Sequence, residues 1–325
     1  MTAPRTRVQR RPVHGVLLLD KPLGLSSNNA LQRCKWLLRA EKAGHTGTLD
    51  PLATGVLPLC FGAATKFSQL QLDADKTYEA TIRLGQKTST GDAEGDVIET
   101  RDVPALTAAD IAAIASRFTG PQRQVPPMYS ALKKDGKALY EYARAGEDVE
   151  REPRDIVVRE LHLTPDGTTD LRMVARVTKG TYIRTLGEDI GEALGCGGHL
   201  VALRRIATGQ FDVSQCVTLD AFEAMTDEAR SQALHPVESL LVDHTRVTLD
   251  SDNAGRFLSG LRRRGTWLDD AQVAVFGPLP PSSQPSSPEG RREALLGTAH
   301  VKGGELIPGR LLSPPEVAQI QESNP

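Results

Sequence analysis

Runs of apolar residues and regular alternations divide the first part of the chain into short elements. The continuous run 15–20, GVLLLD, predicts a buried strand that ends at Lys21 and a proline. The polar triplet 26–28 can cap a helix, and a later apolar run predicts a strand over 56–61. One face of that helix collects five apolar side chains: Ala30, Leu31, Cys34, Leu37 and Leu38.

Alternation of apolar and polar residues governs the middle of the chain. Positions 78–84 alternate as in a half-buried strand, and a T-x-x-D start at Thr107 begins a helix that Gly120 stops. The same criteria predict strands at 154–163, 171–177 and 199–206, and a helix over 183–194. Strands mostly follow strands without βαβ alternation, so we expect an α+β fold with a mixed, largely antiparallel sheet and flanking helices.

The pattern of the sequence changes near residues 240–247, where long elements give way to short ones. Short strand-like segments follow at 246–249, 272–276 and 294–301, separated by glycine and proline. The stretch 277–292 holds five prolines and four serines, which predicts disorder or a long exposed loop. We therefore divide the chain into three parts: a flexible basic arm (1–12), a first domain (13–240) and a small β-rich domain (247–325).

Composition narrows the class of protein. The chain has 325 residues, and its hydrophobic content of 39% and charged content of 25% are typical of a soluble globular protein. No apolar run approaches the ~20 residues of a membrane span, and no signal peptide follows the basic N-terminus. The four cysteines are widely spaced, which argues against zinc or disulfides and favours a cytoplasmic location.

Charge is unevenly distributed, although the net charge is only −2. Residues 1–44 carry nine lysines and arginines against two acids, whereas residues 220–252 carry eight acids against two arginines. A local positive cluster can bind phosphates, and it can equally be a solvated arm. Charge therefore suggests a nucleic-acid partner without establishing it.

The stretch 44–62, GHTGTLDPLATGVLPLCFG, is unlike a core-forming segment. Gly44, Gly47 and Gly55 permit backbone conformations that other residues avoid, and they leave room for a second molecule. Asp50 is the single acid in the stretch, and the proline after it restricts the backbone. Such a carboxylate is either a turn residue that caps the next segment, the usual role in Asp-Pro, or a nucleophile.

Two further segments favour the chemical interpretation of Asp50. Tyr78 lies on the strand in KTYEATIRLG, and Tyr182 and Arg184 lie at the helix start in KGTYIRT. Each signal is weak alone, because a strand tyrosine is usually a half-buried aromatic and a helix arginine is usually a surface charge. Found together with Asp50, the two segments favour a chemical role for these residues more strongly than either segment does alone.

Four segments together closely resemble the TruB-type tRNA pseudouridine synthases. They are GVLLLDKPLGLSS, GHTGTLDPLATGVLPL, QVPPMYSALKKDGKALYEYAR and KGTYIRTLGEDIGEALG, in the order of that family. The resemblance runs from about Val13 to Phe211, whereas 247–325 resembles the family's PUA domain only in position, size and texture. It implies the pseudouridine synthase fold and isomerisation of the uridine at position 55, in the TΨC loop of tRNA. No metal, nucleotide or other cofactor is implied, consistent with the lack of CxxC, HExxH and GxxxxGK[ST] patterns.

The resemblance also implies roles for individual residues. Asp50 matches the catalytic aspartate, Arg184 the arginine that pairs with it, and Tyr78 the tyrosine that stacks on the target base and assists C5 deprotonation. His45 matches the histidine that replaces the flipped nucleotide in the RNA loop. Whether the carboxylate attacks C1′ or C6, or helps to form a glycal, stays open. The supporting positions are Lys21, Tyr182 and Leu203.

Recognition of the T-arm is expected to rely on shape and on phosphate contacts. Candidate backbone contacts are the N-terminal arm, Lys133, Lys134, Arg204, Arg205, Arg262, Arg263 and Arg264, of which the last three are equally compatible with a solvated loop. The β-rich domain should add affinity, and the resemblance implies a monomer. A non-catalytic tRNA-binding or tRNA-folding protein is the alternative, as is a glycosylase with paired acids. The presence of Asp50, Tyr78 and Arg184 together disfavours the binding protein, and the single acid of the motif disfavours the glycosylase.

Overall fold

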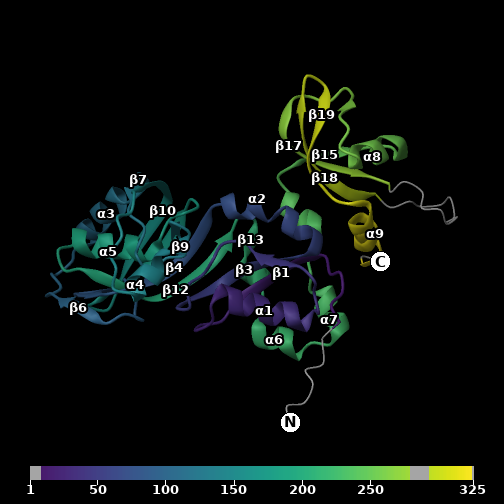
Figure 1. The fold of residues 1–325 in the computed structure, drawn as a ribbon. Helices are drawn as coiled ribbons and strands as arrows, with labels where there is room; N and C mark the ends of the chain where they lie inside the picture. Colours follow the sequence, from purple (N-terminus) through teal and green to yellow (C-terminus); the bar gives the residue numbers. More distant parts are fainter. Residues whose placement is uncertain (1–8, 279–292, 324–325) are drawn as a thin grey trace, which may run out of the picture.

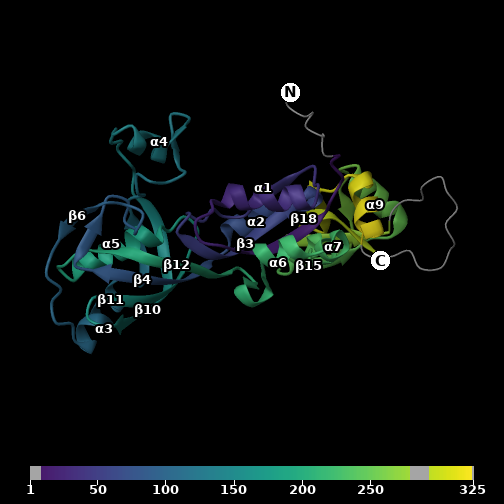
Figure 2. The same ribbon diagram turned by 90° about the horizontal axis from the view of Figure 1, so that it is seen from below.

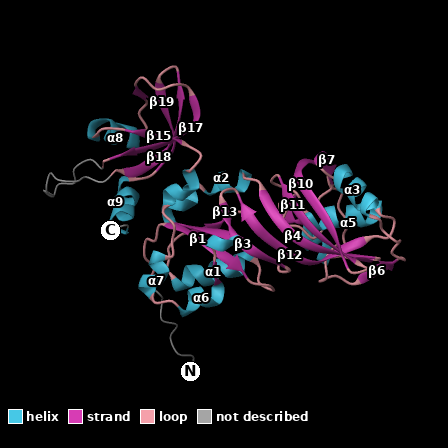
Figure 3. Ribbon diagram, turned by 180° about the vertical axis from the view of Figure 1, so that it is seen from behind, coloured by secondary structure: helices cyan, strands magenta, loops and turns pink. Residues whose placement is uncertain are grey.

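A long mixed sheet forms the body of the molecule, and a smaller sheet stands beside one of its ends (Figures 1 and 3). The computed structural model describes residues 9–278 and 293–323. The strands of the long sheet are β1 (Gly15–Lys21), β2 (Ala43–His45), β3 (Ala53–Phe61), β4 (Lys76–Leu84), β7 (Gly120–Gln124), β10 (Arg154–Asp166), β11 (Asp170–Val177), β12 (Gly198–Thr208), β13 (Phe211–Asp212) and β14 (Val217–Thr218).

The order of these strands confirms the α+β prediction. They run β14-β1-β3-β12-β4-β11-β10-β7, with β2 paired to β3 and β13 paired to β12. The β1–β14 and β3–β12 pairs are parallel, and the other pairs of this sheet are antiparallel. The parallel β3–β12 pair lies in the middle of the sheet, which brings the chain around residue 50 beside β12 and β4.

Helices flank the sheet where the sequence predicted them. The helix α1 (Ser27–Leu37) begins after Ser26, whose side chain accepts from the Asn29 N–H, and α3 (Ala108–Arg117) begins with a capping box between Thr107 and Asp110. The predicted helix after the KGT turn is α5 (Ile183–Ala193). The remaining short helices of this part are η1 (Gly62–Lys66), α2 (Ser68–Asp73), α4 (Leu139–Arg144), η2 (Val213–Gln215), α6 (Leu219–Ala224), α7 (Asp227–Gln232) and η3 (Val237–Leu241).

Two insertions between strands of the long sheet project from it. The hairpin β5 (Gln86–Thr88) and β6 (Val97–Thr100) encloses a turn whose Asp92 bridges to Leu200 on β12. The other insertion, which we call the flap (residues 131–153), contains the hairpin β8 (Lys133–Lys134) and β9 (Lys137–Ala138) and the helix α4. Figure 2 shows α4 standing apart from the layer of strands.

The smaller sheet contains the strands predicted in the last part of the chain. Its order is β15 (Thr245–Thr248), β17 (Asp270–Gly277), β18 (Ala294–Lys302), β19 (Glu305–Leu311) and β16 (Arg263–Arg264). We did not predict β19 or the helices α8 (Ser251–Leu258) and α9 (Pro314–Ser323), because Pro308 and Gly309 interrupt the alternation of β19. Most of the predicted Pro/Ser loop at 277–292 lies outside the described residues.

The two sheets share one apolar core rather than being joined only by a linker. A single cluster of buried side chains contains Val16 and Phe67 from the first part together with Val275 and Val317 from the last. Lys66 Nζ lies 2.6 Å from Glu316 Oε2 and also donates to the Leu311 carbonyl at 2.9 Å. The predicted division between 13–240 and 247–325 therefore crosses a packed interface.

The predicted flexible arm is partly docked. Residues 1–8 lie outside the described residues, but the Arg10 guanidinium donates to the Lys35 and Ala40 carbonyls, and Arg11 donates to Leu38. Arginine side chains thus satisfy carbonyls in the last turn of α1 and just after it, a favourable place for a cation. This part of 1–12 belongs to the folded body. Across the described ranges, no helix is long and apolar enough to cross a membrane.

Candidate functional site

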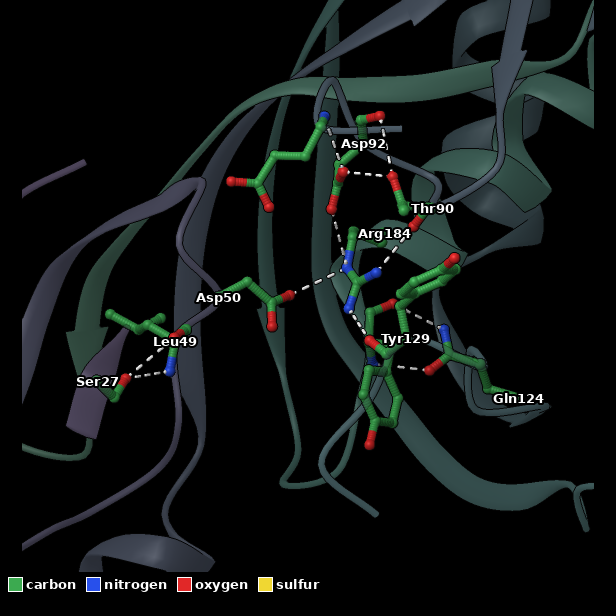
Figure 4. Close-up of polar contacts among 10 residues, drawn as sticks. Ser27, Leu49, Asp50, Thr90, Asp92, Gln124, Tyr129 and Arg184 are labelled. Carbon is green, nitrogen blue, oxygen red and sulfur yellow. Dashed lines mark hydrogen bonds and ion pairs between the residues drawn. The ribbon is translucent and has the colours of Figure 1, made fainter. Parts of the chain in front are cut away.

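Asp50 lies on the loop between β2 and β3, and glycines set the shape of that loop. Gly47 in the loop has φ of 86° and Gly55, near the start of β3, has φ of 101°, values that favour glycine. A Cβ at Gly55 would lie 2.1 Å from the Arg205 carbonyl oxygen. Gly44 differs from our expectation, because its φ is not positive and its Cβ position is open. Ser27 Oγ holds the next part of the loop by bonding both the N–H and the carbonyl of Leu49 (Figure 4).

The Asp50 carboxylate pairs with Arg184, as the resemblance implied. Arg184 Nε lies 3.0 Å from Asp50 Oδ2, and the arginine is only 4% exposed. Its two other nitrogens donate to main-chain carbonyls, Nη1 to Thr90 at 2.8 Å and Nη2 to Tyr129 at 2.5 Å (Figure 4). Because all three guanidinium nitrogens have acceptors, the group has little freedom to rotate. It therefore holds the Asp50 carboxylate in one orientation.

A second carboxylate, which the sequence analysis did not single out, shares Arg184. Asp92 is buried, and its Oδ2 lies 3.5 Å from Arg184 Nε. The Thr90 hydroxyl donates to Asp92 Oδ1 at 2.6 Å, and the Glu94 N–H donates to the same oxygen at 3.0 Å. The signal was the stretch TSTGDAEGD, which combines turn residues with acids, but nothing in it indicates a partner at residue 184.

Burial and charge act in opposite directions on Asp50. The side chain is 39% exposed, yet the surrounding protein removes enough water from the carboxylate to raise its pKa above the ordinary value. The Arg184 guanidinium lowers the pKa of Asp50, whereas the Asp92 carboxylate raises it. The balance is a raised pKa, so Arg184 offsets only part of the burial, and Asp50 is not the lone acid that the loop suggested.

A cavity of about 350 Å³ opens beside Asp50. Its wall includes Tyr78 from β4, Leu203 from β12, and Tyr182 and Arg184 at the start of α5. The volume is within the range of small-molecule sites, ~300–1,000 Å³. The structure thus brings five predicted residues, from four separate segments, to one cavity of a size that suits a single base and its sugar.

A neighbouring cavity of about 460 Å³ shares Asp50 and Arg184 with the first. It is lined by His45 on one side and by Tyr140 and Arg144 of the flap on another. Burial lowers the pKa of His45, and the Arg205 charge acts in the same direction. Its Nδ1 atom is buried without a hydrogen-bond partner among the described residues.

Lys21 does not line either cavity but stabilises the main chain next to the site. The side chain is fully buried, and Nζ donates to the carbonyls of Pro22 at 2.9 Å and Leu25 at 2.6 Å, with Pro51 at 3.5 Å. It is not part of the wall of either cavity. Burial lowers the pKa of Lys21 to about 8, an effect that the nearby Asp50 charge partly opposes. Lys21 therefore ties β1 to the segment that follows Asp50.

One of the predicted RNA-backbone contacts, Arg205, is buried inside the protein, which corrects that expectation. Arg205 is 1% exposed, and it donates from Nε to the Val56 carbonyl at 2.7 Å and from Nη2 to Gly47 at 3.1 Å. Arg204 pairs with Asp20 at 2.7 Å. The Arg204 side chain is 36% exposed, so Arg204 stays a candidate contact despite its pairing with Asp20. Arg205 therefore holds the loop that carries Asp50 against β12, and its guanidinium is not available to RNA phosphates.

The other predicted basic contacts lie at the surface. Lys133 and Lys134 are exposed on the β8–β9 hairpin of the flap. Arg262 and Arg264 are exposed beside the smaller sheet, and both pair with Glu305, at 3.4 Å and 2.9 Å. Arg263 is half-buried, and its Nε and Nη1 have no partner within the described part of the chain. Glu305 therefore neutralises part of the charge of this triplet.

Comparison with known proteins gives one family over most of the chain. The N-terminal domain of the TruB family pseudouridylate synthases matches residues 35–183, and the tRNA pseudouridylate synthase B C-terminal domain matches residues 184–242. A tRNA pseudouridine synthase B from Verminephrobacter eiseniae is 60% identical, over 99% of this chain and 96% of its own. One from Cupriavidus metallidurans is 56% identical, over 94% of this chain and 96% of its own.

Solved structures give the same fold at lower identity. A chain of a Cbf5-Nop10-Gar1 complex matches with a TM-score of 0.66 and 23% identity, over 98% of this chain and 93% of its own. A chain of an H/ACA RNP bound to a substrate RNA containing 2′-deoxyuridine matches with a TM-score of 0.65 and 22% identity, over 94% and 88%. These likenesses cover both sheets and concern the fold alone.

Proposed function

Since the chain belongs to the TruB family of pseudouridylate synthases, we propose that it isomerises a uridine in the TΨC loop of tRNA to pseudouridine, at position 55. Relatives that are 60% and 54% identical over nearly the whole chain are tRNA pseudouridine synthases. The observation that carries the assignment of the site is the Asp50–Arg184 pair at 3.0 Å, which opens on a cavity walled by Tyr78 and Leu203.

The reaction rearranges bonds within one nucleotide. The N1–C1′ bond breaks, the uracil turns, a C5–C1′ bond forms, and the C5 proton is lost while N1 gains one. Atoms and electrons balance without an oxidant or a reductant. We propose that Asp50 supplies the carboxylate that acts on the target uridine while its base detaches from the sugar. Arg184 orients this carboxylate through a charge-assisted hydrogen bond. Tyr78, on the wall beside Asp50, is placed to stack on the base and to assist removal of the C5 proton.

The target base must leave its stack before it can reach Asp50. Extrusion of a base costs a few kcal/mol, and an aromatic ring that fills the vacated space offsets part of this cost. His45 is the candidate for that role, because it lines the neighbouring cavity of about 460 Å³, which also contains Asp50. Lys133 and Lys134 on the flap offer positive charge for the phosphates of the stem.

The smaller sheet has a separate role in this proposal. It corresponds in place to the appended PUA domain that the resemblance implied, and its exposed arginines are far in sequence from Asp50. We propose that it adds affinity for tRNA and no catalytic group. A protein that only binds or folds tRNA has no use for an aspartate held in this position, since a carboxylate repels phosphates.

The test is to incubate the purified protein with a T-arm stem-loop RNA, without any added cofactor, and to map pseudouridine by chemical probing. We expect one modified site, in the loop, and no modification of an anticodon stem-loop of equal length. Asp50→Asn should abolish the modification and keep tRNA binding within a few fold. Substantial turnover by this variant would contradict the role of Asp50, and an unmodified T-arm with wild-type protein would contradict the function.

A further inference from the structure

The start of α5, which carries Arg184, is held by a side chain from the end of another strand. Gln124 Nε2 donates to the Tyr182 carbonyl at 3.0 Å, and Gln124 Oε1 accepts from the Tyr182 N–H at 2.8 Å. Gln124 is the last residue of β7 and is only 4% exposed. One amide group thus makes both hydrogen bonds that a strand neighbour would otherwise make to Tyr182.

The N-cap residue of α5 has no capping bond of its own, and Gln124 holds the main chain of that residue. Tyr182 is the N-cap residue of α5, in an extended conformation, and its own side chain makes no capping bond. Two residues earlier, Gly180 has φ of 81° and open space around its Cβ position. A helix start that follows such a turn has few local restraints. The orientation of the first turn of α5 therefore depends on Gln124, which lies 58 residues earlier in the chain.

The same segment touches the Arg184 side chain a few residues later. Arg184 Nη2 donates to the Tyr129 carbonyl at 2.5 Å, and Ser130, the next residue, lines both cavities. Figure 4 shows Gln124 and Tyr129 on one side of Arg184, with Asp50 on the other. The segment 124–130 thus contacts both the main chain before Arg184 and its guanidinium. It then continues directly into the flap.

We propose that Gln124 is a positioning residue for the isomerisation. By fixing the main chain at Tyr182, Gln124 sets the direction in which Arg184 meets Asp50. Because residues 124–130 lead into the flap, Gln124 also links the position of Arg184 to the base of the flap. The inference rests on the proposed function, because it concerns the rate of that reaction. Misplacement of a catalytic group by ~1 Å can cost ~10²-fold in rate, so a small rotation of α5 is enough to matter.

The test compares Gln124→Met and Gln124→Glu with the wild-type protein and with Gln122→Met. Gln122 lies on the same strand and donates to the Phe118 carbonyl, away from α5, so it is a matched control. We expect Gln124→Met to lower kcat at least tenfold on the T-arm RNA, with KM and the tRNA Kd within threefold of wild type. Gln122→Met should keep the wild-type kcat.

Gln124→Glu adds a readout that a merely structural role would not move. An ionised glutamate still accepts from the Tyr182 N–H but repels the Tyr182 carbonyl, whereas a protonated one can donate to it as glutamine does. The activity of Gln124→Glu, divided by that of wild type at the same pH, should therefore rise as the pH falls from 8 to 5.5. Activity of Gln124→Met, divided in the same way, should not change with pH.

Each outcome distinguishes this inference from the proposed function. If the wild-type protein modifies the RNA and Gln124→Met keeps kcat within threefold, Gln124 does not position Arg184. A pH-independent ratio for Gln124→Glu would also overturn the inference, even if Gln124→Met failed to fold. A wild-type protein without turnover would instead contradict the proposed function, and with it the inference about Gln124, which concerns the rate of that reaction.

Discussion

At the scale of single residues, Arg184 holds the site together. It meets Asp50 and Asp92 through Nε and two main-chain carbonyls through Nη1 and Nη2. Only a guanidinium offers donors in these directions from one rigid plane, and a lysine presents a single mobile ammonium group. The arrangement therefore depends on the shape of the cation as much as on its charge.

Arg184→Lys tests this dependence on shape. We expect kcat to fall about 100-fold, a loss of about 2.7 kcal/mol of transition-state stabilisation, while the tRNA Kd changes by less than threefold. Single-turnover measurement on the T-arm RNA gives kcat, and filter binding gives Kd. Arg172→Lys, on the exposed face of β11, is the control. A lysine variant with more than a third of the wild-type kcat would show that charge alone suffices.

The pH dependence follows from the raised pKa of Asp50. Only the ionised carboxylate can act, so activity is lost as the pH falls through the pKa of the folded protein, which burial places above the ordinary value. Arg184 lowers this pKa, so weakening the pair must move the acid limb of kcat/KM to higher pH. Arg184→Lys should show that shift between pH 4 and 8. An acid limb that moved to lower pH would contradict the assignment.

Lys21 gives a second electrostatic test near the same carboxylate. Its pKa is lowered to about 8 by burial, and the negative charge of Asp50 raises it from a still lower value. Asp50→Asn removes that charge, so the pKa of Lys21 should fall below that of the wild-type protein. Titration of the lysine Cε resonance by NMR measures both values. A rise, or a wild-type titration near the ordinary ~10.4, would contradict the buried position.

At the scale of elements, the loop between β2 and β3 is closed around Arg205. The guanidinium bonds carbonyls on both sides of Asp50, at Gly47 and Val56, while the Arg205 main chain lies against Gly55. Such close approach needs a residue without Cβ at position 55. The glycines that first suggested room for RNA therefore serve, at Gly47 and Gly55, the contact between the loop and β12.

Gly55→Ala and Gly44→Ala separate these two uses of glycine. At Gly55 a methyl group meets the Arg205 carbonyl in a left-handed conformation, so we expect a loss of about 3 kcal/mol or more in the free energy of unfolding. At Gly44 the space is open and φ is not positive, so the change should stay within about 1 kcal/mol. Urea denaturation measures both. Equal stability of the two variants would contradict the closed loop.

At the scale of the whole molecule, the smaller sheet is part of the fold and not only an added binding surface. Val16 and Phe67 share a core with Val275 and Val317, and the Lys66–Glu316 pair crosses the junction. Removal of residues 247–325 would expose this apolar face. Loss of tRNA affinity in such a deletion would therefore mix two causes, lost contacts and lost stability.

Deletion of 247–325 should lower the melting temperature of the remaining chain, with some turnover retained at temperatures where it stays folded. The matched comparison is Arg262→Ala with Arg264→Ala in the full chain, which should keep the melting temperature within about 2 °C, because surface charges contribute little to stability. If that double variant also keeps the wild-type tRNA Kd, these arginines do not contact the RNA. An unchanged melting temperature in the deletion would contradict the shared core.

The sequence by itself determined most of the long strands and helices of the first part of the chain, and it nominated the candidate site residues. The alternation at 78–84, the caps at Ser26 and Thr107 and the turn before Ile183 are local patterns, and local patterns follow from backbone geometry. Asp50 and Arg184 were nominated because their segments combine unusual residues with a resemblance to a family.

Only the tertiary structure decided what surrounds those residues. Arg184 binds the Thr90 and Tyr129 carbonyls, 94 and 55 residues away, and main-chain acceptors leave no trace in side-chain identity. Gln124, at the end of β7, meets Tyr182 at the start of α5, and Arg205 is buried where its guanidinium meets the Gly47 and Val56 carbonyls. Burial and partnership depend on which strands become neighbours, and that choice is made by the packing of the whole chain.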